Sequence, residues 1–191
     1  MAKKKKIKKA MKKTEATILA KAPSVKEEVK KTRIRIIGVG GGGGNIVSEI
    51  AARIKGASFV VANTDSQALK AIGEKAAIFQ FGENFTHGLG TGMNSQVAEE
   101  AAEAEKEKIK KILQGQDLVV LVATLGGGAG SGALPVFAKI SRSLGNLTLG
   151  IFTLPFKFEG DRKMEIANAF SELTDAEEQR AKTLCGSALK Q

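Results

Sequence analysis

The sequence predicts a three-layer α/β domain built on a mostly parallel sheet. Strand and helix signals alternate between residues 33 and 173, the order that places helices on both faces of a parallel sheet. Residues 117–123 (DLVVLVA) form an almost unbroken apolar run, as expected for a central strand buried on both faces. Two glycine-rich segments each join a strand to the helix that follows.

Five strands are expected from short runs of apolar and β-branched residues. The first, residues 33–39 (RIRIIGV), ends in glycines, and the second, residues 58–62 (SFVVA), is mostly apolar. The other three are expected at residues 76–79, 117–123 and 147–154.

Helices are expected between these strands. Isoleucines recur every fourth residue in residues 45–55, which is helical spacing. Asp65 can cap a helix that runs to residue 72, and Asn94 or Ser95 can cap one long helix that runs to residue 113. Further helices are expected at residues 133–144, with Pro135 in the first turn, and at residues 161–173, while residues 82–93 are expected to form a loop.

The charge distribution divides the chain into segments. Of the net charge of +10, residues 1–32 contribute +9, from 12 lysines and three glutamates. We expect residues 1–32 to be a disordered basic arm, residues 33–175 to be the folded domain and residues 176–191 to be a divergent or truncated tail. The arm is either a solvated tail or a tether to a membrane surface or nucleic acid.

The composition excludes several classes of protein. Cys185 is the single cysteine, so no internal disulfide can form, and a reducing cytoplasm is favoured. No apolar run reaches the roughly 18–20 residues that span a bilayer, and no apolar segment of a secretory signal follows the charged N-terminus. We therefore expect a cytoplasmic protein.

The first candidate site is the glycine run that joins the first strand to the first helix. Five consecutive glycines precede Asn45, and such a turn lets the backbone N–H groups and the helix dipole approach a phosphate. Gly38, Gly40 and Gly43 also fit the dinucleotide pattern G-x-G-x-x-G, with Asp65 near the end of the second strand. No Gly-Lys-Ser/Thr follows, so the run is not a Walker A loop. A dinucleotide-dependent oxidoreductase therefore stays open at this point.

The second glycine run, GGGAGSG at residues 126–132, narrows the choice. A second phosphate loop after an adjacent strand is unusual in dinucleotide enzymes, and it would let two helix N-termini face one polyphosphate. Two facing glycine loops without a phosphate-binding lysine suit a triphosphate held chiefly by backbone N–H groups.

Five motifs in order resemble the FtsZ/tubulin family. They are GVGGGGGN at residues 38–45, NTDSQAL at residues 63–69, GLGTG at residues 88–92, GGGAGSG at residues 126–132 and PFKFEG at residues 155–160. The resemblance implies a Rossmann-like, doubly wound domain that binds GTP or GDP, with Mg²⁺ accompanying the nucleotide. It also implies partners that are copies of the chain or full-length FtsZ-like subunits.

The resemblance further implies where the nucleotide is held. One glycine segment would hold phosphate and ribose, the next would close over the γ-phosphate side, and the last would hold the phosphates. Glu159 would contact the ribose, and Lys163, where the family usually has arginine, would contact the nucleotide. The implied site residues are Gly41, Gly42, Gly43, Gly44, Asn45, Gly90, Thr91, Gly92, Gly126, Gly127, Gly128, Ala129, Gly130, Ser131, Gly132, Glu159 and Lys163.

Three residues depart from the family pattern. Ala129 stands where threonine is usual, so one phosphate-facing hydroxyl is lost. Lys163 keeps the positive charge of the usual arginine but lacks its bidentate fork. His87 replaces an arginine and, as a lone histidine, is assigned neither a metal site nor a catalytic role. No catalytic residue is assigned.

The end of the sequence does not resemble the family. An FtsZ chain would continue after residue 173 into a last strand, a central helix that reads guanine and an acidic loop, and none of these is recognised in residues 174–191. We expect nucleotide binding with weak hydrolysis unless a partner supplies the acidic loop. The alternative is a non-hydrolysing module that binds or caps FtsZ filaments. Because no last strand is recognised to pair with residues 147–154, we expect this strand to be an open edge of the sheet. Such an edge favours self-association, marginal stability or dependence on a partner.

Overall fold

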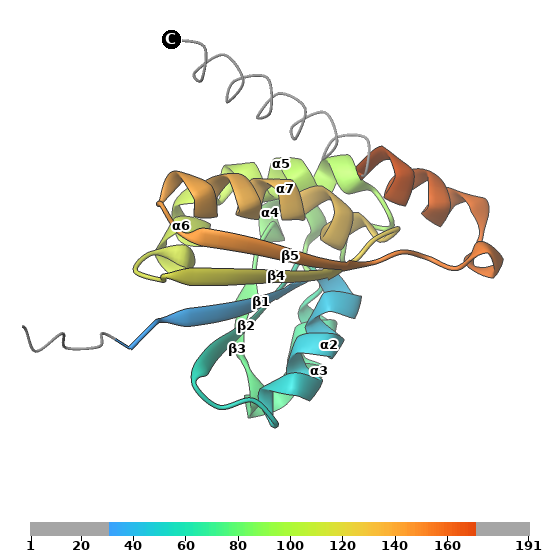
Figure 1. Cartoon of the computed structure of the whole chain (residues 1–191). Helices are drawn as coiled ribbons and strands as arrows, with labels where there is room; N and C mark the ends of the chain where they lie inside the picture. Colours follow the sequence, from blue (N-terminus) through green and yellow to red (C-terminus); the bar gives the residue numbers. More distant parts are fainter. Residues whose placement is uncertain (1–30, 171–191) are drawn as a thin grey trace, which may run out of the picture. The chain divides into compact units, whose positions relative to one another are not determined.

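Five parallel strands form one sheet in the computed structural model, which describes residues 31–170 (Figure 1). The strand order is β3-β2-β1-β4-β5, and each strand lies within one residue of its predicted position. The strands are β1 (Ile34–Val39), β2 (Ala57–Asn63), β3 (Ala77–Gln80), β4 (Leu118–Thr124) and β5 (Leu147–Thr153). The α/β architecture with a parallel sheet is therefore confirmed. The predictions for residues 1–30 and 171–191, including the basic arm, the tail and the missing last strand and central helix, lie outside the described residues.

Helices cover both faces of the sheet (Figure 1). On one face lie α2 (Gly40–Ala51) and α3 (Ser66–Ile72), whose apolar core includes Val47, Leu69 and Val61. On the other face lie α5 (Ser95–Ala104), α6 (Lys106–Leu113) and α7 (Gly128–Ser143), over a larger core around Phe81 and Phe137. The remaining helical segments are η1 (Gly73–Lys75), α4 (Glu83–Thr86), η2 (Lys157–Glu159) and residues 161–170.

The predicted starts of α2 and α7 were wrong, because both helices begin inside their glycine runs. Helix α2 starts at Gly40 and α7 at Gly128, although glycine costs about 1 kcal/mol per helical position relative to alanine. Glycine runs by themselves favour a turn. Here the tertiary structure prevails, because each strand leads directly into the helix that packs on the sheet. Pro135 is consequently the eighth residue of α7 and does not lie in its first turn.

The single long helix predicted for residues 94–113 is two helices that meet at Glu105. The backbone of Glu105 leaves the helical region (φ −104°, ψ 20°), and its Oε1 accepts a hydrogen bond from Gly82 N at 3.0 Å. Of the two predicted caps, Asn94 and Ser95, it is Asn94 that caps the first helix, since its Oδ1 accepts from Gln96 N at 3.0 Å and Val97 N at 3.2 Å. The stretch predicted as loop contains the single turn α4.

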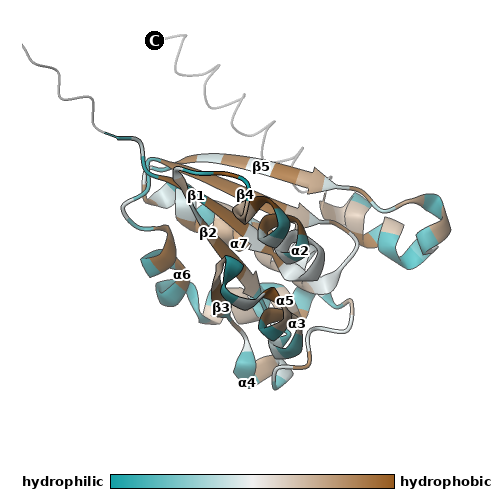
Figure 2. Cartoon of the chain, turned by 90° about the horizontal axis from the view of Figure 1, so that it is seen from below, coloured by the Kyte–Doolittle hydropathy of each residue, from teal (hydrophilic) through white to brown (hydrophobic). Residues whose placement is uncertain are grey.

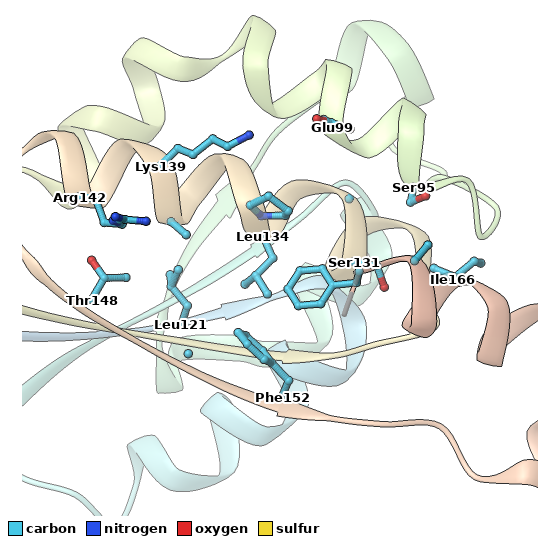
Figure 3. A pocket seen from close by; sticks show the side chains of 16 residues that line it. Ser95, Glu99, Leu121, Ser131, Leu134, Lys139, Arg142, Thr148, Phe152 and Ile166 are labelled. Atoms are coloured by element: carbon cyan, nitrogen blue, oxygen red, sulfur yellow. The ribbon is translucent and has the colours of Figure 1, made fainter. Parts of the chain in front are cut away.

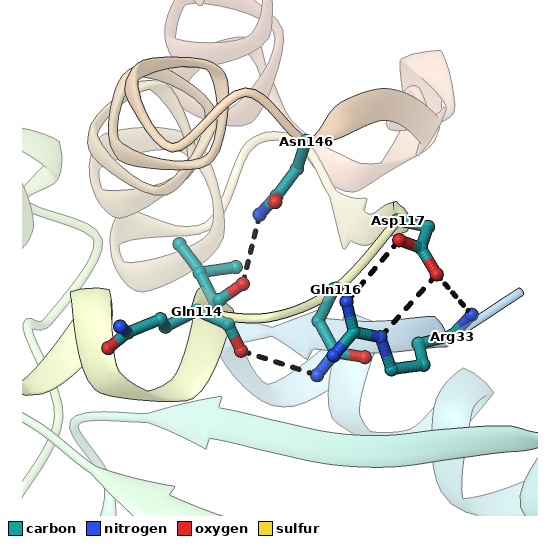
Figure 4. A network of polar contacts seen from close by, with 6 residues as sticks. Arg33, Gln114, Gln116, Asp117 and Asn146 are labelled. Atoms are coloured by element: carbon teal, nitrogen blue, oxygen red, sulfur yellow. Dashed lines mark hydrogen bonds and ion pairs between the residues drawn. The ribbon is translucent and has the colours of Figure 1, made fainter.

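Polar contacts hold the amino-terminal ends of the central strands together (Figure 4). Arg33 N donates to Asp117 Oδ2 at 2.7 Å, and the Arg33 guanidinium lies 3.5 Å from Asp117 Oδ1. Asn146 Nδ2 donates to Leu113 O at 2.9 Å. The first two contacts join the start of β1 to the start of β4, and the third joins the turn before β5 to the end of α6, all at the edge opposite to the glycine loops.

Strand β5 is an exposed edge of the sheet within residues 31–170. It pairs with β4 through seven residues, and no other described strand adjoins it. Leu147, Leu149 and Ile151 remain 69%, 51% and 51% exposed, and brown apolar bands follow the strand in Figure 2. The predicted open apolar edge is therefore present in the described part of the chain.

Candidate functional site

The carboxyl ends of β1, β2 and β4 surround a cavity of about 290 Å³. Because the strand order reverses at β1, this is the switch point at which parallel α/β sheets usually bind ligands. Backbone segments make up most of the wall. The lining residues are Gly40, Gly41, Gly42, Asn63, Thr64, Asp65, Ala68, Leu89, Gly90, Thr91, Gly92, Thr124, Gly127, Gly128, Ala129 and Gly130.

The two long glycine runs touch each other beside this cavity. Gly40 has a left-handed φ of +76°, and a Cβ on it would lie 2.7 Å from Gly130 N. Only glycine allows that backbone conformation and that approach together. The amino-terminal turns of α2 and α7 therefore open on one space, where their free N–H groups and dipoles favour an anion.

The third glycine segment closes the cavity from the side of α3. Thr91 lies directly against Gly128, where an added Cβ would collide with the threonine hydroxyl. Ser66 N donates to Gly88 O at 3.0 Å, and a β-bridge joins Asp65 to Leu89. Asp65 also caps α3, since its Oδ1 accepts from Gln67 N at 2.8 Å and Ala68 N at 3.1 Å. Residues 88–92 are thus fixed to the start of α3.

Three residues of the first predicted run do not line the cavity. Gly43 and Gly44 are buried in the contact of α2 with the sheet, where a Cβ on Gly43 would collide with Val122 O and one on Gly44 would lie 2.6 Å from Val61 Cγ1. Asn45 is exposed on α2. These glycines bring helix and sheet together, which helps to fix the position of Gly40 and Gly41.

Three residues of the second run also lie outside the lining. Ser131 Oγ is buried and accepts a hydrogen bond from Gly126 N at 3.1 Å, so this hydroxyl braces the turn. Gly132 lies at the crossing of α5 and α7, where a Cβ would collide with Ser95 O. The structural roles of Ser131 and Gly132 could not be predicted from the sequence, because they depend on which face of α7 packs on α5.

Glu159 and Lys163 form an ion pair with each other. Lys163 Nζ lies 2.8 Å from Glu159 Oε2, and Glu159 Oε1 accepts from Phe156 N at 2.8 Å. The hydrogen bond from Lys163, followed by that from Phe156, lowers the pKa of the exposed Glu159 carboxyl below its usual range. Neither side chain lines the cavity, but the Lys163 backbone abuts the second run: a Cβ on Gly126 would lie 2.9 Å from Lys163 O.

Several residues that line the cavity were not among the implied site residues, although most of them belong to the motifs at residues 38–45, 63–69 and 88–92. Asn63 ends β2, Thr64 and Asp65 follow it, and Thr124 ends β4. The rule that ligands lie beyond the carboxyl ends of parallel strands could have found all four. Ala68 and Leu89 also line the cavity, as does Gly40, which the sequence analysis named as part of the first glycine run.

A second cavity, of about 350 Å³, lies between α5, α7, β5 and residues 161–170 (Figure 3). Its wall is mainly apolar, with Leu121, Leu134 and Phe152 pointing into it (Figure 3). It contains Ser131 and Gly132 but none of the other predicted site residues. Of the glycine runs its wall includes only Ser131 and Gly132, and Ser95 is its one residue at the start of a helix outside them. The smaller cavity, where both long runs meet, is therefore the better candidate for a nucleotide.

The chemistry of the smaller cavity is that of an anion cradle. Its described lining contains no lysine or arginine, and Asp65 is its one carboxylate. No group of three or more histidine, cysteine, aspartate or glutamate side chains suited to a metal occurs within residues 31–170. Binding here would therefore depend on backbone N–H groups and helix dipoles.

Comparison with known proteins gives the family. Residues 33–181 match the Tubulin/FtsZ family, GTPase domain. The chain belongs to this family. It is 48% identical over 135 residues to the cell division protein FtsZ of Azotobacter vinelandii and 45% identical over 139 residues to that of Coxiella burnetii. These alignments cover 70% and 72% of the chain but 34% and 36% of the relatives, so the chain spans about a third of their length.

Solved structures share the fold of this chain. A structure titled as an empty FtsZ dimer of M. jannaschii is 38% identical, with a TM-score of 0.71 over 79% of this chain and 46% of that chain. CetZ2 from Haloferax volcanii, at 24% identity, has a TM-score of 0.67 over 73% of this chain and 45% of that chain. No helix within residues 31–170 is long and apolar enough to cross a membrane.

The departures from the FtsZ/tubulin pattern have defined places in the structure. Ala129 is one of the residues that line the cavity, at the position where the pattern has a threonine. His87 ends α4 in the left-handed conformation (φ 51°), and its N–H donates to Glu83 O at 2.8 Å. Lys163 is paired with Glu159.

Proposed function

We propose that this chain binds GTP or GDP, accompanied by Mg²⁺, in the cavity at the carboxyl ends of β1, β2 and β4. The observation that carries the proposal is the meeting of two helix N-termini and the segment at residues 90–92 around one cavity. Such an arrangement can hold a polyphosphate without a lysine. Membership of the Tubulin/FtsZ GTPase family supports guanine as the base, and the CetZ2 relative is described as bound to GTPγS.

Mg²⁺ fits this site as a companion of the phosphates. Mg²⁺ keeps several waters and usually takes one or two carboxylates together with substrate phosphates. Asp65 is the available carboxylate, and its Oδ1 already accepts two backbone hydrogen bonds that fix its position. Asp65 would hold the hydrated ion, which would offset the charge of the phosphates.

The proposal is tested by titrating the 191-residue chain with GTP, GDP, ATP and NAD in the presence of Mg²⁺. Tighter binding of GTP and GDP than of ATP is expected. Equal affinity for GTP and ATP would contradict the guanine preference and would indicate a site that binds the phosphates without selecting the base. Competition between NAD and GTP would favour the dinucleotide alternative, and no binding of any of the four would overturn the nucleotide site.

We further propose that hydrolysis by this chain alone is weak. Within the described lining the only carboxylate is Asp65, which caps α3 through Oδ1 and is proposed to hold Mg²⁺, so the lining offers no second carboxylate as a general base. The family resemblance implies that an acidic loop of a neighbouring subunit activates the water. Copies of this chain or FtsZ-like subunits are the proposed partners, in keeping with relatives described as a dimer and a protofilament.

A non-hydrolysing module that binds or caps FtsZ filaments is the second candidate. Phe156 and Phe158 favour it, because these stacked rings stay 67% and 85% exposed beside the Glu159–Lys163 pair, as a partner-binding surface would be. Phosphate release measured with and without added full-length FtsZ separates the two. Phosphate release above the sum of the two proteins measured separately supports a GTPase, whereas release below that of FtsZ alone supports a cap.

A further inference from the structure

The larger cavity, of about 350 Å³ between α5, α7, β5 and residues 161–170, has an apolar wall that is partly exposed. Phe152, which lines it from β5, is 39% exposed, and Gly150 and Ala169 in the same wall are exposed as well. Protein interiors are close-packed, with few voids larger than a water molecule. An apolar cavity of this size at the surface therefore marks a place that another segment covers.

The helical residues 161–170 form one wall of this cavity, and their spacing points to the next residue that reaches it. Ile166, Ala169 and Phe170 line the cavity at positions i, i+3 and i+4 of a helical repeat, and position i+7 is Leu173. The sequence predicts that this helix runs to residue 173. Leu173 is therefore the next apolar side chain on the face that lines the cavity.

The charge of the segment after Phe170 complements the charge at the far end of the cavity. Lys139 and Arg142, both exposed on α7, lie at the end away from Ile166 (Figure 3), and Glu99 is the one acidic residue of the described lining. Residues 171–178 contain four acidic residues and no basic residue. Such a segment can bury an apolar side chain in the cavity and pair its charges at the rim.

We propose that residues 171–178 of the same chain dock on this cavity, with Leu173 inside it and acidic side chains beside Lys139 and Arg142. The chain's own segment is favoured over a second copy, because Phe170 is itself part of the wall and holds the segment at a high effective concentration. Ser131 and Gly132 belong to the same wall, so the docked segment packs behind the second glycine run.

Disulfide trapping tests the contact directly in the 191-residue chain. Leu173→Cys is combined in turn with Ala138→Cys and with Thr148→Cys, which line the cavity from α7 and β5. Cys185→Ser removes the single native cysteine. Because a disulfide requires Cα atoms within about 7 Å of each other, mild oxidation should give an intramolecular disulfide in at least one pair, seen as a faster monomer band in a non-reducing gel.

Leu184→Cys, combined with the same two wall cysteines, is the matched control. Leu184 lies outside residues 171–178, so it should form at least tenfold less disulfide than Leu173→Cys does. A disulfide found mainly in dimers would overturn the proposal in favour of a second copy of the chain. No disulfide with either wall position, or equal yields from positions 173 and 184, would overturn it as well.

Thermal unfolding provides a measurement that does not depend on cysteine geometry. Leu173→Glu should lower the Tm by roughly 3–10 °C, since a leucine leaves an apolar site, whereas Leu184→Glu should leave the Tm unchanged. Equal Tm values of the two variants would contradict the proposal.

A pair of charge reversals tests the basic rim. Lys139→Glu with Arg142→Glu should lower the disulfide yield of Leu173→Cys at low salt, because the acidic segment is then repelled. Lys110→Glu with Lys111→Glu makes the same change in net charge on α6, outside the cavity, and should leave the yield unchanged. Equal yields in the two double variants would overturn the assignment of Lys139 and Arg142 to the docked segment.

Discussion

Glycines that look alike in the sequence have different physical roles in this site. Gly41 lines the cavity, and a Cβ on it would meet no atom within 4 Å. Gly43, two residues later in the same run, is buried, and a Cβ there would collide with the backbone of β4. The first glycine leaves room for a ligand, whereas the second leaves room for the sheet.

This difference leads to a prediction for two alanine substitutions. Gly41→Ala should keep or raise stability, by up to about 1 kcal/mol, because alanine is the better helix former, but it should weaken nucleotide binding by placing a methyl in the cradle. Gly43→Ala should destabilise the fold by about 1–3 kcal/mol through overpacking. Thermal unfolding and GTP titration measure the two effects. A Gly41→Ala protein with unaltered affinity would show that the cradle does not approach the phosphates closely.

The ion pair of Glu159 with Lys163 predicts a pH dependence. The pKa of this carboxyl is lowered by the Lys163 hydrogen bond first and by the Phe156 N–H second. A carboxyl with a lowered pKa in the folded state stabilises it above the ordinary value near 4.3, and the stabilisation is lost as the pH falls through the lowered pKa. The contact between Glu159 and Lys163 should therefore be lost in acid, at a pH below the ordinary range of a glutamate.

NMR chemical shifts of residues 156–163 followed from neutral to acid pH measure this titration. The midpoint for Glu159 should lie below that of an ordinary glutamate, and Lys163→Gln should move it upward. The exposed Glu49 carboxylate, which pairs with Arg53 on α2, serves as an internal reference for unfolding elsewhere. An unmoved midpoint in Lys163→Gln would exclude Lys163 as the cause.

At the scale of elements, the sequence located strands better than helix ends. The apolar runs of β1 and β4 specify strands because both faces are buried. The starts of α2 and α7 were not predictable from local preferences, since glycines in them are retained for close approach and not for a turn. The break between α5 and α6 could not be predicted from the local sequence either, because Glu105 at the break bonds to Gly82, a residue that is distant in sequence.

The break at Glu105 can be tested directly. Glu105 Oε1 accepts the N–H of the buried Gly82 at 3.0 Å, so Glu105→Ala would leave that N–H without an acceptor. A loss of about 1–3 kcal/mol in unfolding free energy is expected. Glu105→Gln retains an acceptor and should lose less. Denaturant unfolding measures the unfolding free energy of both variants. If Glu105→Ala and Glu105→Gln are equally stable, the loss of stability is due to the lost charge and not to the lost hydrogen bond.

At the scale of the whole domain, the site arises from topology more than from any single residue. The predicted segments at residues 41–42, 90–92 and 127–130 do line one cavity, because parallel strands deliver their carboxyl ends to the same edge. Thr64 and Thr124 were missed because each is one ordinary residue at a strand end. Glu159 and Lys163 stay predictions, since their side chains contact each other beside the second glycine run.

The last prediction concerns the edge of the sheet. Strand β5 has no charged residue or proline, and its Leu149 and Ile151 are each 51% exposed, so it lacks the features that normally prevent edge pairing. We expect the 191-residue chain to self-associate through this strand. Lysine at Leu149 or Ile151 should shift the population toward monomer, because a charge on an apolar edge opposes pairing.

Light scattering coupled to size-exclusion chromatography, over a range of concentrations, measures this association. Ile78→Lys is the control, because Ile78 is 56% exposed on the opposite edge strand β3, which has only four residues to offer for pairing. It should leave association unchanged. A chain that is monomeric at every concentration, or lysine variants of β5 that associate as the unsubstituted chain does, would contradict the prediction. Association reduced by all three lysines alike would assign it to net charge and not to the β5 edge.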